Sequence, residues 1–134
     1  MNFVSTRIIT ADVKRLVDFY ETVTGIKLML YTEDFAELVT AAGTLAIGST
    51  RTLRLFGGHH VAGPAANRSA IVEFRVADVD DEYRRLGEIL DGALVQAPTT
   101  MPWGNRSLLF RDPDGNLVNF FAPVTAEAIA KFER

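Results

Sequence analysis

The sequence predicts an α+β protein built from two tandem βαβββ modules whose sheets share one cleft. Two internal repeats support the duplication. Ala11-Asp12-Val13 returns 66 residues later as Ala77-Asp78-Val79, and the glycine turn at Gly43 returns 72 residues later at Gly115. Nearly constant spacing through both halves indicates one module that occurs twice, with a few residues added to the second copy.

Composition narrows the class of protein. A chain of 134 residues with 48% hydrophobic and 23% charged residues is typical of one globular domain. The absence of cysteine excludes disulfides and thiolate catalysis. No apolar run approaches the ~20 residues of a membrane span, and a net charge of −3 gives no basic surface for nucleic acid. We therefore expect a cytoplasmic protein that binds neither membrane nor nucleic acid.

Module one is expected over about residues 1–48. The β-branched and apolar run 3–10 predicts a strand. Asp12 is a suitable N-cap for the helix that follows, which Gly25 ends. The apolar side of this helix repeats at helical spacing in Val13, Leu16, Val17 and Tyr20. Strands are then predicted over 26–31, 35–40 and 44–48.

A linker over about residues 49–68 precedes module two, at about 69–122. The linker contains Gly57-Gly58-His59-His60. Module two repeats the order with a strand over 70–76, a helix from the Asp78 cap to Leu90, and strands over 94–97, 106–111 and 116–121. Asp112-Pro113-Asp114-Gly115 predicts the turn between the last two strands. A short C-terminal helix is predicted at about 125–133.

These features together resemble the vicinal oxygen chelate superfamily, which includes glyoxalase I, extradiol dioxygenases and bleomycin resistance proteins. The resemblance rests on Asp12 followed by Phe19-Tyr20, and on Arg111-Asp112-Pro113-Asp114-Gly115-Asn116-Leu117 near the end. It covers nearly the whole chain in the correct order. It implies a single domain over residues 1–134, with the sheets curved into a mixed-sheet half-barrel, and a homodimer. Because one fold hosts many reactions, function has to be argued from the site.

The resemblance also implies where a metal would be held. In metalloenzymes of the superfamily the ligands lie on the first and last strands of each module, and alignment places these positions at Ser5, Ile47, Ile71 and Asn119. Divalent iron, manganese or zinc requires imidazole or carboxylate donors, which these residues lack. We therefore expect no metal and no other cofactor.

Alternation along the strands predicts which other side chains face the cleft. Ser5 and Arg7 are expected there from the first strand, Ile71 and Glu73 from its counterpart, and Asn119 and Phe121 from the last strand. Arg7 and Glu73 either contact a ligand or form a structural ion pair across the two modules. Trp103, between a proline and a glycine, is expected either in the core or at the mouth of the cleft. His60 is either a solvated loop residue or a ligand contact.

These expectations favour a metal-independent protein that sequesters an aromatic or amphipathic small molecule, as bleomycin resistance proteins do. The alternative is an enzyme of the superfamily, such as a lyase, isomerase or dioxygenase. Such an enzyme would use atypical metal ligands or a metal-free mechanism with His59 or Glu73 as the base. A third reading is a regulatory or partner domain whose cleft is filled by its own side chains.

Overall fold

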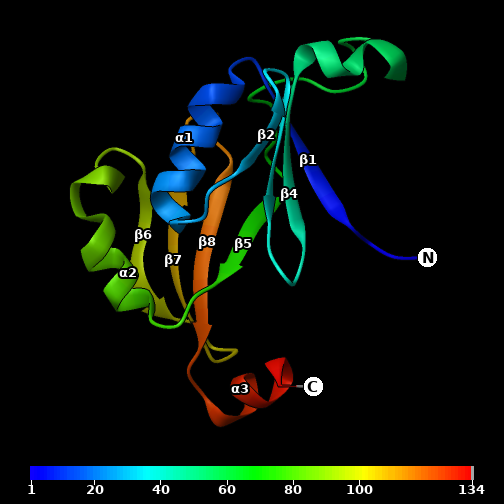
Figure 1. Ribbon diagram of the computed structural model, residues 1–134. Coiled ribbons are helices and arrows are strands. Elements are labelled where there is room, and N and C mark those ends of the chain that lie inside the picture. Colours follow the sequence, from blue (N-terminus) through cyan, green and yellow to red (C-terminus); the bar gives the residue numbers. More distant parts are fainter. Residues whose placement is uncertain (134) are drawn as a thin grey trace. The chain divides into compact units, whose positions relative to one another are not determined.

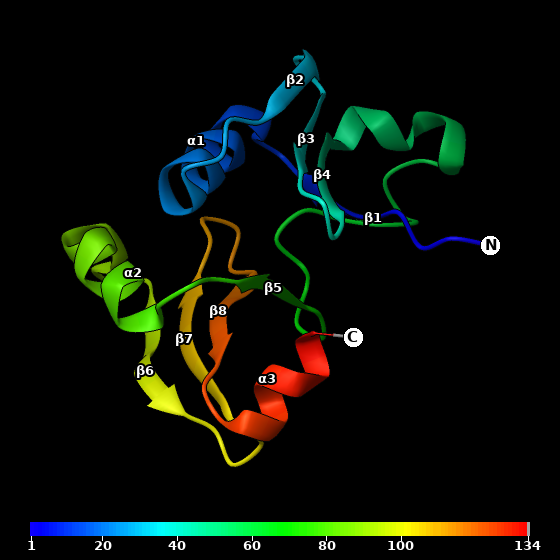
Figure 2. The ribbon, with the colours of Figure 1, turned by 60° about the horizontal axis from the view of Figure 1, so that its bottom comes forward.

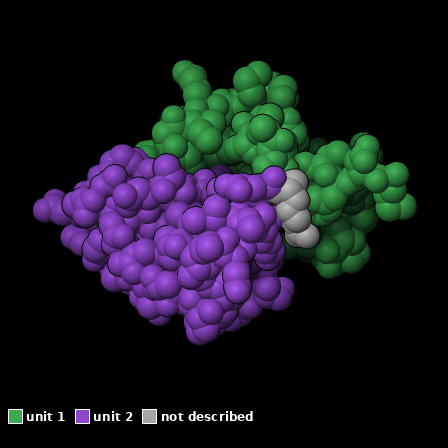
Figure 3. All heavy atoms as spheres, turned by 90° about the horizontal axis from the view of Figure 1, so that it is seen from below, with its two compact units in different colours: residues 1–67, 113–115 green, residues 68–112, 116–134 purple. Residues whose placement is uncertain are grey.

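The structure, a computed structural model, describes residues 1–133 and divides into two compact units (Figures 1 and 3). Unit 1 comprises residues 1–67 and 113–115, and unit 2 comprises the remaining described residues from 68 onwards. Each unit contains one four-stranded mixed sheet with a helix on one face. The two predicted βαβββ modules are therefore confirmed, while their shared cleft stays a prediction.

Unit 1 has the strand order β1-β4-β3-β2, in which β1 and β4 are parallel and the other neighbours are antiparallel. Its elements are β1 (Ser5–Thr10), α1 (Val13–Thr24), β2 (Met29–Thr32), β3 (Phe35–Val39), β4 (Thr44–Ser49) and the 3-10 helix η1 (Thr50–Phe56). Part of the expected linker therefore forms the helix η1. The Ser49 hydroxyl group caps its start, and Gly57 caps its end.

The predicted ends of α1 are confirmed. An Asp12 carboxylate oxygen accepts a hydrogen bond from the Arg15 backbone N–H at 3.1 Å, and Gly25 ends the helix in the left-handed region at φ 71°. The following strand starts at Met29 rather than at residue 26. Residues 26–28 are bound back to α1 instead, since the Leu28 backbone N–H donates to a Glu21 carboxylate oxygen at 2.8 Å.

Unit 2 repeats this arrangement with the order β5-β8-β7-β6, again with the first pair parallel. Its elements are β5 (Ile71–Arg75), α2 (Val79–Leu86), the 3-10 helix η2 (Gly87–Leu90), β6 (Leu94–Thr100), β7 (Asn105–Arg111), β8 (Leu117–Pro123) and α3 (Ala126–Phe132). The helix predicted to reach Leu90 is interrupted at Gly87, whose φ of 46° no longer fits an α-helix. Figure 2 shows α3 beside the ends of β7 and β8.

Each sheet buries one face beneath its helix. In unit 1, α1 packs on β3 and β4, and the buried side chains include Leu16, Tyr20, Leu38 and Ile47. In unit 2, α2 packs on β6, β7 and β8, where Leu108, Phe110, Val118 and Phe120 are buried. Because strand side chains alternate, the intervening residues lie on the opposite face of each sheet. That opposite face is called the open face below.

Candidate functional site

The open face of unit 2 brings together three of the predicted site residues. Glu73 on β5 is directly opposite Asn119 on β8, and Ile71 is one step along, opposite Leu117. The Asn119 side-chain N–H donates to a Glu73 carboxylate oxygen at 2.8 Å. Strand register and the hydrogen bond agree that these side chains share one face. The structure therefore brings these three side chains together on one face of the sheet, and their contact with a ligand stays a prediction.

Asn119 has a further property that the sequence does not show. The residue is only 9% exposed, and none of the described residues donates a hydrogen bond to its Oδ1 atom. An unfilled buried acceptor costs about 1–3 kcal/mol of folding free energy. Ile71, by contrast, is 51% exposed at the same face. The open face therefore combines an apolar surface with an acceptor that needs a donor.

Phe121 lies on the same face but is partly covered by the C-terminal helix α3. The ring of Phe121 lies 5.4 Å from the ring of Phe132, measured between centroids, and the Arg75 guanidinium carbon lies 5.3 Å from the Phe132 centroid. Beside this contact is an open pocket of about 440 Å³. It is lined by Arg75, Val76, Ala77, Ala122, Pro123 and Ile129. The end of β8 therefore presents an open hollow with both polar and apolar surface and one cationic side chain.

The open face of unit 1 carries Ser5 and Arg7. Both are exposed, opposite Thr44 and Ala46 of β4. The Arg7 guanidinium lies over two rings, 5.2 Å from the centroid of Phe35 and 5.4 Å from that of Phe56. The sequence did not indicate that either phenylalanine contacts Arg7. The place of Phe35 could have been predicted. Antiparallel pairing of the strands around residues 35–39 and 44–48 puts Phe35 opposite Gly48, on the same face as Arg7.

The register corrects the position assigned to Ile47. Ile47 is opposite Ile8 and is fully buried, which places it on the helix-covered face and not beside Ser5 and Arg7. Ala46 is the residue of β4 that occupies the open face. A shift of one residue along a strand moves a side chain to the other face, so the repeat spacing of 72 taken from the glycine turns misplaced this position. The pairings of Ser5 with Thr44 and of Ile71 with Leu117 give a spacing of 73 for these last strands.

The corrected positions do not fit a divalent metal. These positions are occupied by Ser5, Ala46, Ile71 and Asn119, whose side chains offer two neutral oxygen ligands and two hydrocarbon groups. Glu73 beside Asn119 adds a single carboxylate. Within residues 1–133, no three side chains among His, Asp and Glu are grouped so that they could hold a metal ion.

Two other predicted residues lie in loops. Trp103 is 68% exposed in the turn between β6 and β7, which the Gly104 backbone N–H closes by donating to the Met101 carbonyl at 2.9 Å. It is therefore not a core residue. His59 and His60 are both exposed, with their rings edge to face at 5.9 Å. Contact of Trp103 or His60 with a ligand stays a prediction, as does the Arg7–Glu73 ion pair.

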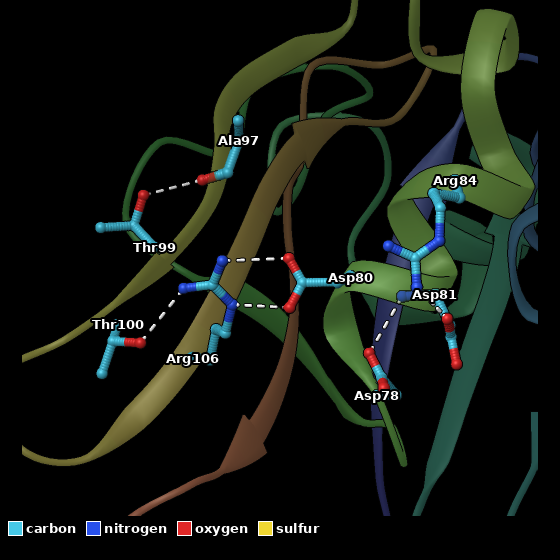
Figure 4. Close-up of polar contacts among 8 residues, drawn as sticks. All are labelled: Asp78, Asp80, Asp81, Arg84, Ala97, Thr99, Thr100 and Arg106. Atoms are coloured by element: carbon cyan, nitrogen blue, oxygen red, sulfur yellow. Dashed lines mark hydrogen bonds and ion pairs between the residues drawn. The ribbon is translucent and has the colours of Figure 1, made fainter.

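The best-formed charged contact of unit 2 lies on the helix side of the sheet, away from the open face. Arg106 on β7 donates from Nε at 2.8 Å and from Nη2 at 3.0 Å to the two carboxylate oxygens of Asp80 on α2 (Figure 4). The hydrogen bonds from Arg106 lower the pKa of Asp80, and the same contact raises the pKa of Arg106. This pair fastens the first turn of α2 to the sheet and has no part in the candidate site.

Comparison with known proteins settles the family. The sequence model of the glyoxalase/bleomycin resistance protein/dioxygenase superfamily matches residues 2–120. The chain belongs to this superfamily. The vicinal oxygen chelate resemblance is thereby confirmed, and the open faces can be compared with the ligand-bearing strands of other members.

Similar proteins of several bacteria support the fold. The uncharacterized protein YwbC of Bacillus subtilis (strain 168) is 26% identical over 119 residues, which are 87% of this chain and 93% of that protein. A crystal structure of a glyoxalase/bleomycin resistance protein/dioxygenase from Nocardioides is 24% identical with a TM-score of 0.73, covering 94% of this chain and 85% of that one. A family enzyme from Burkholderia phytofirmans PsJN is 19% identical with a TM-score of 0.76, covering 90% and 97%. At these identities the two structures establish the shared fold.

One further feature concerns membranes. None of the helices within residues 1–133 combines the length and the apolar character that a transmembrane segment requires.

Proposed function

We propose that this superfamily member is a metal-independent binding protein that sequesters an aromatic or amphipathic small molecule against its open sheet faces. The observation that carries the proposal is Asn119. It is a buried amide on an open face, it is hydrogen-bonded to Glu73, and its Oδ1 atom lacks a donor in the part of the chain that the structure describes. Buried polar groups are normally satisfied, and a bound ligand carrying an N–H or O–H group would satisfy this one.

The open face of each unit suits such a ligand. In unit 2, Ile71 and Leu117 offer apolar surface beside the amide of Asn119. In unit 1, the aromatic rings of Phe35 and Phe56 offer apolar surface of their own. Small-molecule sites typically combine predominantly apolar walls with a few placed polar groups. Sequestration needs only such a surface, and it needs no group that takes part in a reaction.

A thermal-shift screen tests the proposal. Antibiotics, catechols and thiol conjugates are added to the wild-type protein and to Asn119→Leu. A ligand that binds only the native state raises the melting temperature by mass action. We expect at least one aromatic compound to stabilise the wild type and to lose most of this effect in the variant. No stabilisation by any aromatic compound would contradict the proposal.

The same screen separates binding from turnover. Each stabilising compound is incubated with the protein and analysed by mass spectrometry. Recovery of the unchanged compound supports sequestration. Conversion that is lost in Glu73→Gln would instead support the alternative of a metal-free enzyme of the superfamily, with Glu73 as its base.

We further propose that the protein forms a homodimer. Edge strand β2 exposes three consecutive large apolar side chains, since Met29, Leu30 and Tyr31 are each 55–56% exposed. An exposed apolar edge strand is a ready surface for pairing with another chain. Sedimentation equilibrium is expected to give the mass of two chains, and Leu30→Lys is expected to shift the protein toward the monomer.

A further inference from the structure

The side chain of Arg7 lies close against the neighbouring strand β4. Its aliphatic stem crosses Gly48 of β4, where an added Cβ atom would lie 3.1 Å from Arg7 Cδ and 2.9 Å from Thr52 Oγ1. A residue with a side chain at this position would therefore push the arginine away from the sheet. Glycine at 48 lets the stem lie close to the open face of unit 1 and keeps the guanidinium near the rings.

Two aromatic rings then frame the guanidinium group. Phe35 comes from β3 and Phe56 from the end of η1, at 5.2 and 5.4 Å from the guanidinium carbon. Stacked rings satisfy the faces of a guanidinium group through cation–π attraction but leave the N–H groups at its edge free to donate. The two rings therefore orient the guanidinium group of Arg7 without occupying its hydrogen-bond donors.

The frame itself is fixed to the sheet. Asp34, just before β3, accepts hydrogen bonds from the Ser49 hydroxyl and from Arg51 Nε, both at 2.7 Å. Ser49 also caps η1 by accepting from the Arg51 backbone N–H. These contacts connect the start of β3, which bears Phe35, to the start of the helix that ends with Phe56. The two rings are thus placed before any ligand arrives.

Arg7 differs from arginines whose charge is matched by a carboxylate. Arg51 pairs with Asp34, and Arg106 pairs with Asp80. Within unit 1, by contrast, no carboxylate or carbonyl accepts a hydrogen bond from the Arg7 guanidinium; its contacts there are the two rings. A guanidinium group with free N–H donors in a fixed plane is suited to bind an oxyanion through two parallel hydrogen bonds.

We propose that Arg7, framed by Phe35 and Phe56, is an anion-binding subsite that holds the carboxylate, sulfonate or phosphate group of an amphipathic ligand. This inference rests on the proposed function and names its ligand class: an anionic group attached to an apolar or aromatic body. The rings contact the body of the ligand, and the guanidinium edge binds the anionic group. Neutral analogues lose the second contact.

Two fluorescent probes that share one skeleton test the subsite. 8-Anilinonaphthalene-1-sulfonate carries a sulfonate group, and N-phenyl-1-naphthylamine is the same molecule without it. Both are titrated into the wild-type protein, Arg7→Gln, Arg7→Lys and the control Arg54→Gln. The control removes the same charge from an exposed arginine of η1 that has no place between the rings.

We expect the wild type to bind the sulfonate probe more tightly than the neutral probe. Arg7→Gln should raise the dissociation constant of the sulfonate probe by about tenfold, because a charge-assisted pair of hydrogen bonds is lost. The dissociation constant of the neutral probe should change by less than about twofold. Arg7→Lys should fall between, since it keeps the charge but loses the planar fork. Arg54→Gln should behave as the wild type. Phe56→Leu, which retains the guanidinium group, should weaken both probes.

The outcomes separate the two proposals. If the wild type binds both probes with equal affinity, or if Arg7→Gln and Arg54→Gln weaken the sulfonate probe alike, the anion subsite is overturned while sequestration stands. If the wild type binds neither probe and the thermal-shift screen finds no ligand, sequestration fails and the subsite fails with it. Circular dichroism of each variant establishes that the fold is retained.

Discussion

Asn119 and Glu73 are hydrogen-bonded neighbours on two parallel strands, and within residues 1–133 no donor reaches the amide oxygen of Asn119. The amide is fixed in orientation by Glu73, so the unfilled oxygen has a constant position on the open face. In the free protein, this unsatisfied acceptor lowers the free energy of unfolding. Under the proposed function, a bound ligand with a donor group would remove this cost.

Replacement of Asn119 by leucine is expected to weaken ligand binding without weakening the fold. Leucine has a similar volume and removes the unsatisfied acceptor, while the exposed Glu73 carboxylate is hydrated by water. We expect the free energy of unfolding in urea to stay equal or to rise by up to about 1 kcal/mol. A loss of more than about 2 kcal/mol would show that the amide serves the fold and not a ligand.

The Asp80–Arg106 pair is expected to make stability depend on pH. Arg106 lowers the pKa of Asp80 in the folded state, so the unfolded state binds the proton more readily. The stabilisation is therefore present above the unfolded pKa of aspartate, about 3.9, and is lost as the pH falls through the lower folded pKa. Asp80→Asn should lower the urea midpoint at pH 7, and the difference from the wild type should vanish at acidic pH.

Asp18→Asn is the matched control for that experiment. Asp18 pairs with Lys14 on the exposed side of α1, where the two side chains are 59% and 83% exposed. Exposed pairs within one helix contribute little to stability. An equal effect of both variants at pH 7 would contradict the special role of the Asp80 pair.

Substitution of Gly104 by alanine is expected to detach α3. Gly104 has a φ of 93°, and a Cβ atom there would collide with Thr125 Oγ1, while the Ala128 Cβ lies only 3.0 Å away. The Gly104 carbonyl also accepts from the backbone N–H of Val124 at 2.8 Å. We expect a loss of about 1–3 kcal/mol in unfolding free energy. Proteolysis near residue 124 should become faster, whereas Gly43→Ala, where an added Cβ atom meets open space, should leave it unchanged.

The turn between β7 and β8 is expected to depend on Asp112. Its buried carboxylate accepts from the Asn116 backbone N–H at 2.9 Å and from the Asn116 side-chain N–H at 2.7 Å. Asp112→Ala leaves both donors without this acceptor, and we expect a loss of about 2–4 kcal/mol in urea denaturation. A loss below about 0.5 kcal/mol would mean that water replaces the carboxylate without cost.

The sequence predicted the fold well because its signals are local. Caps at Asp12 and Asp78, a terminating Gly25 and the Asp112–Gly115 turn each act within a few residues, so their elements appeared where expected. The helix predicted through Leu90 was wrong at its end, because the buried side of the helix continues into η2 although the α-helical hydrogen bonds do not. Helical periodicity alone cannot separate those two conformations.

The site was predicted less completely because it depends on pairing between distant strands. Glu73 and Asn119 were placed correctly on one face, since both belong to the parallel β5–β8 pair. Ile47 was misplaced by one residue, and the turn repeat carried no information on the β1–β4 register. The stacking of Phe56 on Arg7 depends on η1, which composition had suggested as linker. Tertiary contacts of this kind leave no periodic signal in a sequence.

We expect ligand binding at the open faces to require no metal ion. The most direct test is calorimetric titration of a stabilising aromatic compound into protein whose metal content has been measured, before and after treatment with a chelator and again after addition of Mn²⁺, Fe²⁺ or Zn²⁺. We predict the same dissociation constant in every case and far less than one metal ion per chain in the purified protein. A near-stoichiometric metal ion, or binding that disappears with the chelator and returns with the metal, would contradict it.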